Sequence, residues 1–539
     1  MNYLVPLPVA LPLAVCGWSL VLGPRQTRLH RVLSVVMLAA VVAVDVILLI
    51  EADRHGPLVV HLGDYAPPLG VTLVADRLAG LMLLVSGLVT LIVLLYAFGQ
   101  DTAEGGQTAP FSFFHPAYQI LVAGVSLCFL AGDLVNLYVG FEIMLMASFV
   151  LLTVGGTQPR LRAGSTYVIV SLVSSIVFLA GIAATYAAVG TVNFAQLAVR
   201  LPDVPLGVRT FSQVLLLTVF GVKAAAFPVA AWLPDSYPTA PAPVTAVFAG
   251  LLTKVGVYSI IRAETLYFPG NRLFAVLMAV ACASMVIGIL GAVAQTDLKR
   301  LLSFCLVSHI GFMLFGVALG TRAGIGGAIV YTAHHITVQT TLFLAAGMLE
   351  RRYGTTELTR LGGTARTAPW LAALWFVPAM NLAGIPPLSG FIGKLGVMRA
   401  GAAYGGEWAY LLLAAAAVTS LLTLYAMAKV WNLAFWRAAP TGRPASGPAG
   451  GAGSGEGAGS RGAGSAGAGG AGAGGVGTAT AAPPRAPARI PGLMIGATTA
   501  IVALALAYTV LATPLTGLAD RSAAELLDGS PYIEAVLAK

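Results

Sequence analysis

Four lysines lie inside long apolar runs of this sequence: Lys223, Lys254, Lys394 and Lys429. The other basic residues fall in predicted loops or tails, although arginine outnumbers lysine by 24 to 6. A charge at mid-bilayer costs about 2.5–3.5 kcal/mol, so such residues are retained for a purpose. Arginine keeps its proton in a protein, whereas a desolvated lysine can release it. Lysine inside apolar runs therefore predicts proton transfer.

An acidic residue complements these lysines. Glu142 lies near the middle of the apolar stretch "LYVGFEIMLMASFVLL". A carboxylate in such a place needs a cation beside it to stay ionised, and we expect Lys223 or another buried lysine to be its partner. Asp133 precedes Glu142 by nine residues, or about 13 Å of helix. We therefore place Asp133 near the outer surface, as a possible additional member of the site.

Prolines interrupt the apolar runs close to two of the lysines. Pro228 follows Lys223, and Pro386 and Pro387 precede Lys394. Paired broken helices in corresponding halves of a chain are the sequence signature of inverted repeats with an ion site at mid-membrane. Unwound backbone at this depth must line a cavity or be buried in protein. Each break is therefore expected to admit the water that a lysine needs to exchange protons.

Three histidines lie between the two interrupted runs: His309 in "SFCLVSHIGFML", and His334 and His335 in "YTAHHITVQTTLF". Histidine titrates near neutral pH and can both donate and accept a hydrogen bond, so these residues are candidates for a proton relay with the acid and the lysines. Adjacent helical residues point about 100° apart, so His334 and His335 are not both expected to face one pathway. His309 and His335 are therefore kept as possible additions to the relay.

Each candidate also has a structural interpretation. Lys429 lies at the end of its apolar run and is better explained as an anchor that reaches the membrane interface. His309 could simply donate a buried hydrogen bond. The other three lysines and Glu142 could form fixed ion pairs, but three cations beside one clear acid leave that pairing incomplete.

The elements that must position these residues are membrane helices. The chain has 539 residues, of which 58% are hydrophobic and 9% charged, against about a quarter charged in soluble domains. Apolar runs of sufficient length predict an all-α polytopic membrane protein of about fourteen transmembrane helices. The predicted spans are 3–22, 31–50, 77–98, 117–134, 135–154, 166–189, 211–232, 244–266, 273–294, 300–319, 324–348, 370–400, 408–433 and 491–512. The first of them shows no cleavage signal and is interpreted as a retained span.

Composition also excludes several classes of partner. The four cysteines are widely separated and predict neither disulfides nor an iron–sulfur cluster, and we expect no cofactor or metal site. The net charge of +9 is scattered over loops, which argues against nucleic acid. The partners expected from the residues themselves are protons and the lipid bilayer.

Loop charges predict the orientation. With the N-terminus outside, sixteen lysines and arginines fall on the inner side and ten on the outer side. Both termini are thus expected outside the cell membrane. Residues 437–490, rich in Gly, Ala and Pro, are predicted to be a flexible linker before the last helix.

Several long motifs resemble one family in both wording and order. They are "NLYVGFEIMLMASFVLLT", "GVKAAAFPVAAWLPDSYPTAPAPVTAVFAGLLTKVGVYSIIR", "DLKRLLSFCLVSHIGFML" and "GIPPLSGFIGK". Together they resemble the antiporter-like membrane subunits shared by respiratory complex I (NADH:quinone oxidoreductase) and the multisubunit Mrp Na⁺/H⁺ antiporters, with most similarity to the Mrp D type. The resemblance runs from about residue 70 to 436.

The resemblance implies a fold and a set of roles. It implies two inverted five-helix repeats, each with a discontinuous helix, in a prokaryotic cell membrane. The implied division is 1–112 for three N-terminal helices, 113–268 and 272–436 for the repeats, 437–490 for the linker, and 491–539 for the last helix and tail. By motif match, Glu142 and Lys223 form the charged pair, Lys254 is the connecting lysine, His334 the histidine of the eleventh span, and Lys394 the terminal lysine.

The resemblance has one departure within these motifs. Mrp D-type sequences often read His-Asp followed by Lys-Thr, where this chain has His334, His335, Gln339 and Thr340. A relay that depends more on histidine is the expected consequence.

The function implied is proton translocation within a hetero-oligomeric antiporter that exchanges Na⁺ or another monovalent cation for protons. The alternative is a proton-pumping, non-redox membrane subunit of complex I or of a membrane-bound hydrogenase. A purely structural scaffold is a third interpretation, and the buried lysines argue against it.

Overall fold

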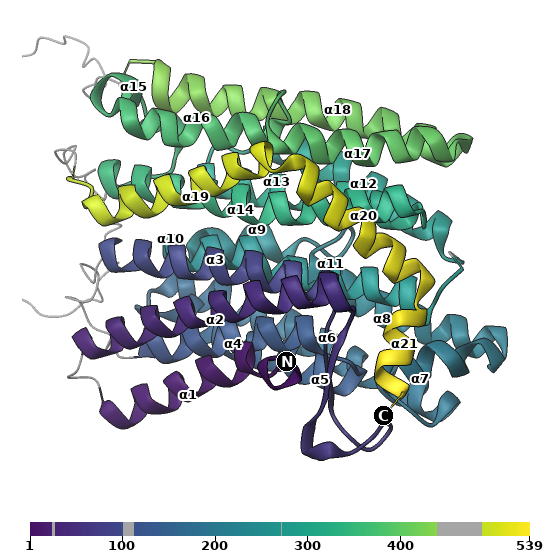
Figure 1. Cartoon of the computed structure of the whole chain (residues 1–539). Coiled ribbons are helices and arrows are strands. Elements are labelled where there is room, and N and C mark those ends of the chain that lie inside the picture. The colour runs from purple at the N-terminus through teal and green to yellow at the C-terminus, as the bar shows by residue number, and fades with distance from the viewer. Residues whose placement is uncertain (24–26, 101–112, 271, 439–487, 539) are drawn as a thin grey trace, which may run out of the picture.

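The computed structural model describes residues 1–23, 27–100, 113–270, 272–438 and 488–538. Most of its helices run side by side in one bundle (Figure 1). Within the described residues, eleven helices are long and apolar enough to cross a membrane. The shorter apolar helices Phe114–Leu130 and Pro369–Ala383, together with the 32-residue helix Arg322–Tyr353, account for the remaining predicted spans.

The N-terminal part contributes three membrane helices. They are α1 (Leu7–Leu22), α2 (Thr27–His55) and α3 (Arg77–Gln100). Between α2 and α3, β1 (Leu58–His61) pairs antiparallel with β2 (Thr72–Ala75), with Leu58 opposite Ala75. This small hairpin was not predicted from the sequence. Helix α3 is mostly buried, whereas α1 and α2 keep much of their apolar surface exposed.

Two successive groups of helices follow. The first holds α4 (Phe114–Leu130), α5 (Leu134–Thr153), α6 (Gln158–Val189), α7 (Phe194–Arg200), α8 (Leu206–Ala224), α9 (Trp232–Ser236), α10 (Ala242–Val247) and α11 (Thr253–Arg262). The second holds α12 (Phe274–Ala294), α13 (Leu298–Ala318), α14 (Arg322–Tyr353), α15 (Thr364–Thr367), α16 (Pro369–Ala383), α17 (Ser389–Tyr404) and α18 (Gly406–Val430). Each group makes five passes, so the second begins on the opposite side and is inverted relative to the first.

Matching local features relate the two groups. Asp133 caps the N-terminus of α5, and Asp297 caps that of α13. Their backbones form isolated β-bridges to Asn193 and Glu357, which follow the two caps by the same number of residues. Helices α6 and α14 both have 32 residues and both end at a left-handed glycine. These features are consistent with the predicted inverted repeats.

A discontinuous helix occurs in each group where the prolines predicted it. Helices α8 and α16 are followed by Ala225 and Gly384, whose backbones are left-handed, with φ of +56° and +87°. Pro228 and Pro387 each follow three residues later. The predicted spans 211–232 and 370–400 are therefore each divided, and proline, which lacks the amide hydrogen, prevents the first half from continuing.

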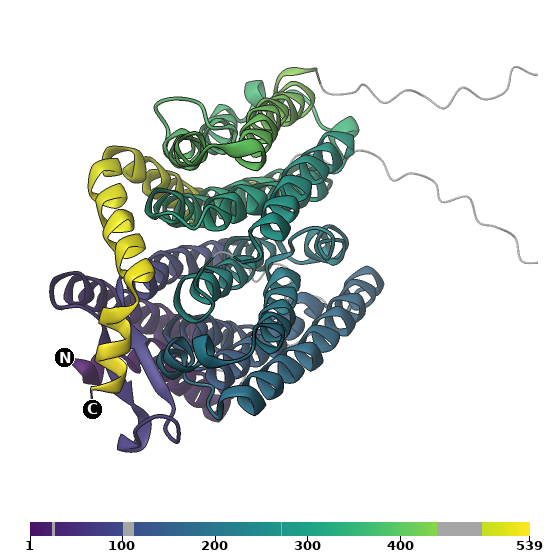
Figure 2. The same ribbon diagram turned by 90° about the vertical axis from the view of Figure 1, so that its right-hand side faces the viewer.

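The C-terminal part contains α19 (Gly492–Val510), α20 (Ala512–Asp528) and α21 (Ser530–Leu537). Helices α20 and α21 cross the ends of the bundle (Figures 1 and 2). Ion pairs tie α20 to the rest of the protein: Arg322–Asp520, Arg521–Asp53 and Arg77–Glu525. Only a tail was predicted after the last span, so this helical strap is an addition to the expected architecture. Most of the predicted linker 437–490 lies outside the described residues.

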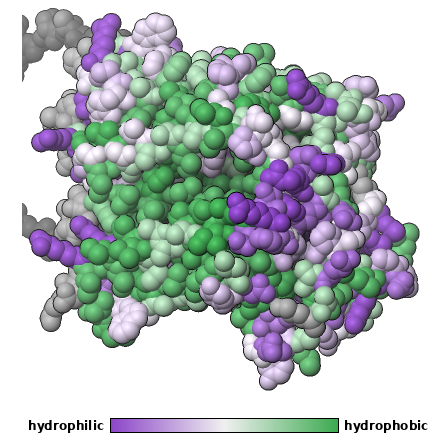
Figure 3. Space-filling view, viewed as in Figure 1, coloured by the Kyte–Doolittle hydropathy of each residue, from purple (hydrophilic) through white to green (hydrophobic). Residues whose placement is uncertain are grey.

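The surface fits a membrane protein. Figure 3 shows a broad hydrophobic face between hydrophilic residues at the two ends of the helices, with a further hydrophilic patch over α20. Large apolar side chains such as Ile176 and Leu421 are 68% exposed on this chain alone. An apolar band of this kind is suited to contact with lipid or with other membrane subunits. The two termini lie near each other, on the side of α20 and α21 (Figures 1 and 2).

Candidate functional site

The first part of the site lies where α8 ends. Lys223 is in the last turn of α8, two residues before the left-handed Ala225, and its Nζ lies 5.5 Å from the centroid of the Phe141 ring. Glu142 is the next residue on α5, near the middle of that helix. Ser175 of α6 donates a short hydrogen bond to Glu142 Oε1. Three helices thus bring an acid, a hydroxyl and a lysine together.

Glu142 and Lys223 interact electrostatically, but within the described residues no nitrogen–oxygen contact of 4 Å or less joins them. The sequence predicted Lys223 or another buried lysine as the partner of Glu142, and in the structure Lys223 interacts with it without a direct ion pair. The carboxylate is instead hydrogen-bonded to a neutral serine, and the ammonium group faces an aromatic ring. An acid and a base held close but apart can pass a proton through an intervening water.

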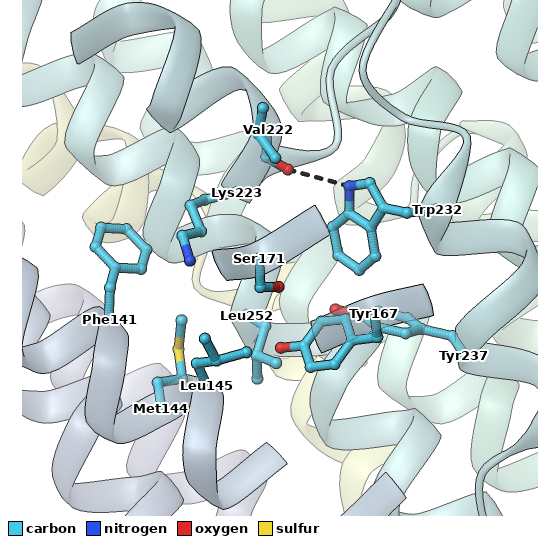
Figure 4. Close-up of a pocket in the computed structure, with 10 residues that line it drawn as sticks. All are labelled: Phe141, Met144, Leu145, Tyr167, Ser171, Val222, Lys223, Trp232, Tyr237 and Leu252. Atoms are coloured by element: carbon cyan, nitrogen blue, oxygen red, sulfur yellow. Dashed lines mark hydrogen bonds between the residues drawn. The ribbon is translucent and has the colours of Figure 1, made fainter. Parts of the chain in front are cut away.

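A small cavity surrounds Lys223. It leaves about 20 Å³ for the centre of a water molecule and is lined partly by Ser171, Tyr167, Trp232 and Leu252. Figure 4 shows the Lys223 amine between Phe141 and Ser171, with the Trp232 indole donating to Val222 O. That space is sufficient for one water with polar partners at hand. The break after α8 therefore places hydratable space beside the lysine.

Lys254 occupies the centre of the bundle. It lies in the middle of the fully buried span Ala242–Tyr267 and donates a 2.6 Å hydrogen bond to Ala249 O. The turn just before it, Phe248–Leu252, is π-helical, a local widening that often marks functional positions. Two residues beyond Lys254, Gly256 packs against the backbone of Lys223 and Ala224, where a Cβ atom would be 2.4 Å from Ala224 N. Glycine here brings α11 against the end of α8.

The three candidate histidines form one buried cluster with Tyr331. His309 of α13 hydrogen-bonds Tyr331 OH through Nδ1, and its ring lies 5.2 Å from that of His335. His334 and Tyr331 have stacked rings 5.5 Å apart. His334 and His335 are both fully buried and both face this cluster, although only one of them was expected to do so. Although the two side chains leave α14 in different directions, the close packing of α13, α14 and α17 keeps both in the cluster.

Several histidine nitrogens in this cluster have no partner. His334 Nδ1 is 2.9 Å from Ser389 Oγ at the start of α17. In the described part of the chain, His334 Nε2, His309 Nε2 and both nitrogens of His335 lack a hydrogen-bond partner. Buried polar groups are rarely left unpaired, so these atoms mark positions for water or a transferred proton. The described residues contain no group of three or more His, Cys, Asp or Glu suited to a metal ion.

Lys394 ends the line of polar residues. It lies in α17, beyond the second helix break, and donates a 3.1 Å hydrogen bond to Ala383 O, a carbonyl freed by that break. Its Nζ lies 4.9 Å from the Phe312 ring centroid. Gly384 leaves room for it, because a Cβ there would be 3.0 Å from Lys394 Cδ. Lys254, the histidines and Lys394 lie within electrostatic range of one another.

Asp133 and Lys429 stabilise helix ends. Asp133 accepts a 2.6 Å hydrogen bond from Asn136 N as the N-cap of α5, away from the line of lysines. Burial raises the pKa of this carboxyl group. Lys429 donates to Val293 O and Gln295 O at the end of α12, as an anchoring role requires. Neither residue contacts the polar line described above.

One buried ion pair was not predicted from the sequence. Arg262, expected in a loop, lies at the end of α11 and pairs with Asp76 at 2.6 Å, with both side chains only 2% exposed. Arg262 also stacks on the rings of Tyr258 and Tyr532, at 5.3 and 5.2 Å. The pair joins α11, the start of α3 and α21. The sequence did contain a sign that Arg262 is buried, because it lies only eight residues after Lys254 on the same apolar helix.

Comparisons with known proteins identify the family. The family described as NADH:quinone oxidoreductase/Mrp antiporter, TM, matches residues 131–423, more than half of the chain. The D subunit of the Na⁺/H⁺ antiporter of Alkalihalophilus pseudofirmus is 41% identical over 439 residues, covering 81% of this chain and 87% of that protein. The chain belongs to the NADH:quinone oxidoreductase/Mrp antiporter family. Within the family, the corresponding D subunit of Bacillus subtilis is 37% identical over the same shares of the two chains.

Solved structures agree with the family assignment. A chain of the Mrp complex from Dietzia sp. is 32% identical, with a TM-score of 0.86 and full coverage of both chains. A chain of the archaeal membrane-bound sulfane sulfur reductase is 22% identical with a TM-score of 0.84, which shows a shared fold alone. The predicted resemblance, fold class and transporter-type subunit are thereby confirmed. The individual roles of the site residues remain predictions.

Proposed function

We propose that this chain is the proton-translocating D-type subunit of a multisubunit antiporter that exchanges Na⁺ for protons across a bacterial cell membrane. Relatives that are 37–41% identical are named as the D subunit of a Na⁺/H⁺ antiporter. The observation that supports the mechanism is the set of buried titratable groups that lie between the two helix breaks. By the orientation of loop charges, both termini face outward.

In this proposal, a proton moves in short steps between neighbouring groups. Glu142 and Lys223 exchange it through water in the small cavity. The contact of Gly256 with the end of α8 brings Lys254 next in line. His335 and His309, with unpaired nitrogens, connect Lys254 to His334 and Lys394.

Arrival of a positive charge at one lysine disfavours a second charge on its neighbour, since like charges repel strongly at low dielectric. Occupancy of one site thus regulates the next. A proton-pumping role in a redox complex would use the same relay. For that alternative, the sulfane sulfur reductase comparison supplies only the fold, and the antiporter proposal is preferred on sequence identity.

The test uses the assembled complex in everted membrane vesicles. Glu142→Gln and Lys223→Ala should each abolish Na⁺-induced dequenching of a pH-sensitive dye, while assembly of the complex stays at the parental level. Lys429→Gln is the matched control, because Lys429 is another membrane-embedded lysine that bonds only backbone carbonyls. Normal exchange by either relay variant would contradict the proposal.

A further inference from the structure

A second cleft between membrane helices lies away from the polar line. It leaves about 400 Å³ for the centres of water molecules and is bounded by α14, α17 and α20. Small residues form its walls, among them Gly326, Gly327, Gly396 and Ala403. Arg322, Arg399 and Asp520 lie at its mouth. The cleft thus has an apolar interior and a charged entrance.

The charges at the entrance do not balance. Arg322 is neutralised by Asp520, which accepts from its Nε at 2.8 Å and from a second guanidinium nitrogen. Arg399 is exposed and has no hydrogen-bond or ion-pair partner within the described part of the chain. The mouth therefore carries one uncompensated positive charge. An arginine fork is well suited to bind a phosphate group.

The depth of the cleft matches an amphipathic ligand. Along α17, Arg399 at the mouth and Gly393 at the floor are six residues apart, about 9 Å of helix. Along α14, Arg322 and Val330 are eight residues apart, about 12 Å. The charge thus lies at the end of the helices, on the α20 side, and the apolar walls extend towards the middle of the bundle.

The chemistry of the cleft distinguishes the possible occupants. Glycine and alanine in its walls leave apolar space between α14 and α17 that a flexible acyl chain can enter. The unpaired guanidinium of Arg399 at its mouth complements a lipid phosphate. We propose that this cleft binds one anionic phospholipid, with its phosphate on Arg399 and an acyl chain between α14 and α17.

The bound chain would lie next to the proton-transfer cluster. Gly393 at the floor touches Tyr331, where a Cβ would be 2.8 Å from Tyr331 Cδ2, and Lys394 follows Gly393 directly. An acyl chain in the cleft would keep water on the α20 side from the Tyr331 and Lys394 side chains. The lipid would thus act as a hydrophobic seal of the second helix break.

The test labels the site directly. The purified complex is reconstituted with phosphatidylglycerol that carries a photoreactive group on its acyl chain, and labelled peptides are identified by mass spectrometry. We expect label on 322–330 and 392–403, and at least fivefold less when phosphatidylcholine carries the same group. Arg399→Gln should reduce the phosphatidylglycerol label by a similar factor. Arg272→Gln, an exposed arginine that does not line the cleft, should leave it unchanged.

A second variant fills the cleft without touching the charge. A Cβ on Gly396 would meet only Gly327 Cα, at 3.8 Å, so Gly396→Leu should fold and project into the open space. It should abolish the label. Equal labelling by the two lipids, parental labelling of both variants, or a cross-link from Ala403→Cys to another subunit would overturn the proposal. The assay does not depend on transport, so its outcome is separate from that of the proposed relay.

Discussion

The two inverted repeats contain the same helix break but place the lysine on opposite sides of it. In the first repeat, Lys223 precedes the left-handed residue Ala225 and ends a half-helix. In the second, Lys394 follows the left-handed residue Gly384 and lies within the next half-helix. Both repeats therefore have the same kind of helix break, but the lysine lies before the break in the first repeat and after it in the second.

The polar residues opposite each break also differ. Ser171 of α6 and His335 of α14 lie the same number of residues before the left-handed glycine that ends each helix. The first break faces hydroxyl groups and a cavity of water size, and the second faces imidazoles with unpaired nitrogens. Where space for water exists, a hydroxyl is enough to orient it. Where packing is closer, a side chain that can itself carry the proton is needed.

The largest effect should come from changing the lysines to arginine, which keeps the charge but cannot release the proton. Lys394→Arg should reduce exchange nearly as far as Lys394→Ala, measured by Na⁺-induced dequenching between pH 7 and 9. Lys223→Arg should behave in the same way if both repeats carry protons. Parental rates in Lys394→Arg alone would mean that only the first repeat conducts and that Lys394 acts as a fixed charge.

An intermediate effect is expected at the equivalent residues opposite the breaks. His335→Ser, which makes the second repeat resemble the first, should slow exchange about tenfold or more, because a positioned acid–base group with two unpaired ring nitrogens is lost. Ser171→Ala should slow it less than threefold, since water can remain beside Lys223. The two rates are compared in vesicles with equal amounts of assembled complex. Equal losses would show that the two sites transfer protons in the same way.

The smallest effect concerns the left-handed residues. Alanine is disfavoured by about 1–2 kcal/mol in this conformation, whereas glycine is not. Gly384→Ala should therefore lower the thermal stability of the complex and disturb Lys394, whose Cδ would be 3.0 Å from the new Cβ. Ala225→Gly should leave stability unchanged or raise it by up to about 1 kcal/mol. A loss of stability in Ala225→Gly, seen by differential scanning fluorimetry, would show that Ala225 contributes packing that outweighs its backbone strain.

Local sequence patterns predicted the membrane class, the approximate number of spans and both helix breaks. These depend on hydrophobic length and on proline, which act locally and can be read from consecutive residues. The prediction of proton transfer at Lys223, Lys254 and Lys394 rests on a similarly local pattern, lysine inside apolar runs of a chain rich in arginine. Burial of an ionisable group in an apolar helix is visible without knowledge of its neighbours.

Which side chains contact one another depends on the packing of the helices. The sequence predicted Lys223 or another buried lysine as the partner of Glu142, and it did not reveal that Ser175 from a different helix donates a hydrogen bond to the carboxylate. It assigned Arg262 to a loop, although Asp76, more than 180 residues away, buries it in an ion pair. It also predicted a single histidine facing the site, whereas packing of three helices buries His334 and His335 in one cluster. Contacts between distant segments depend on how helices pack, and no local pattern of residues specifies that packing.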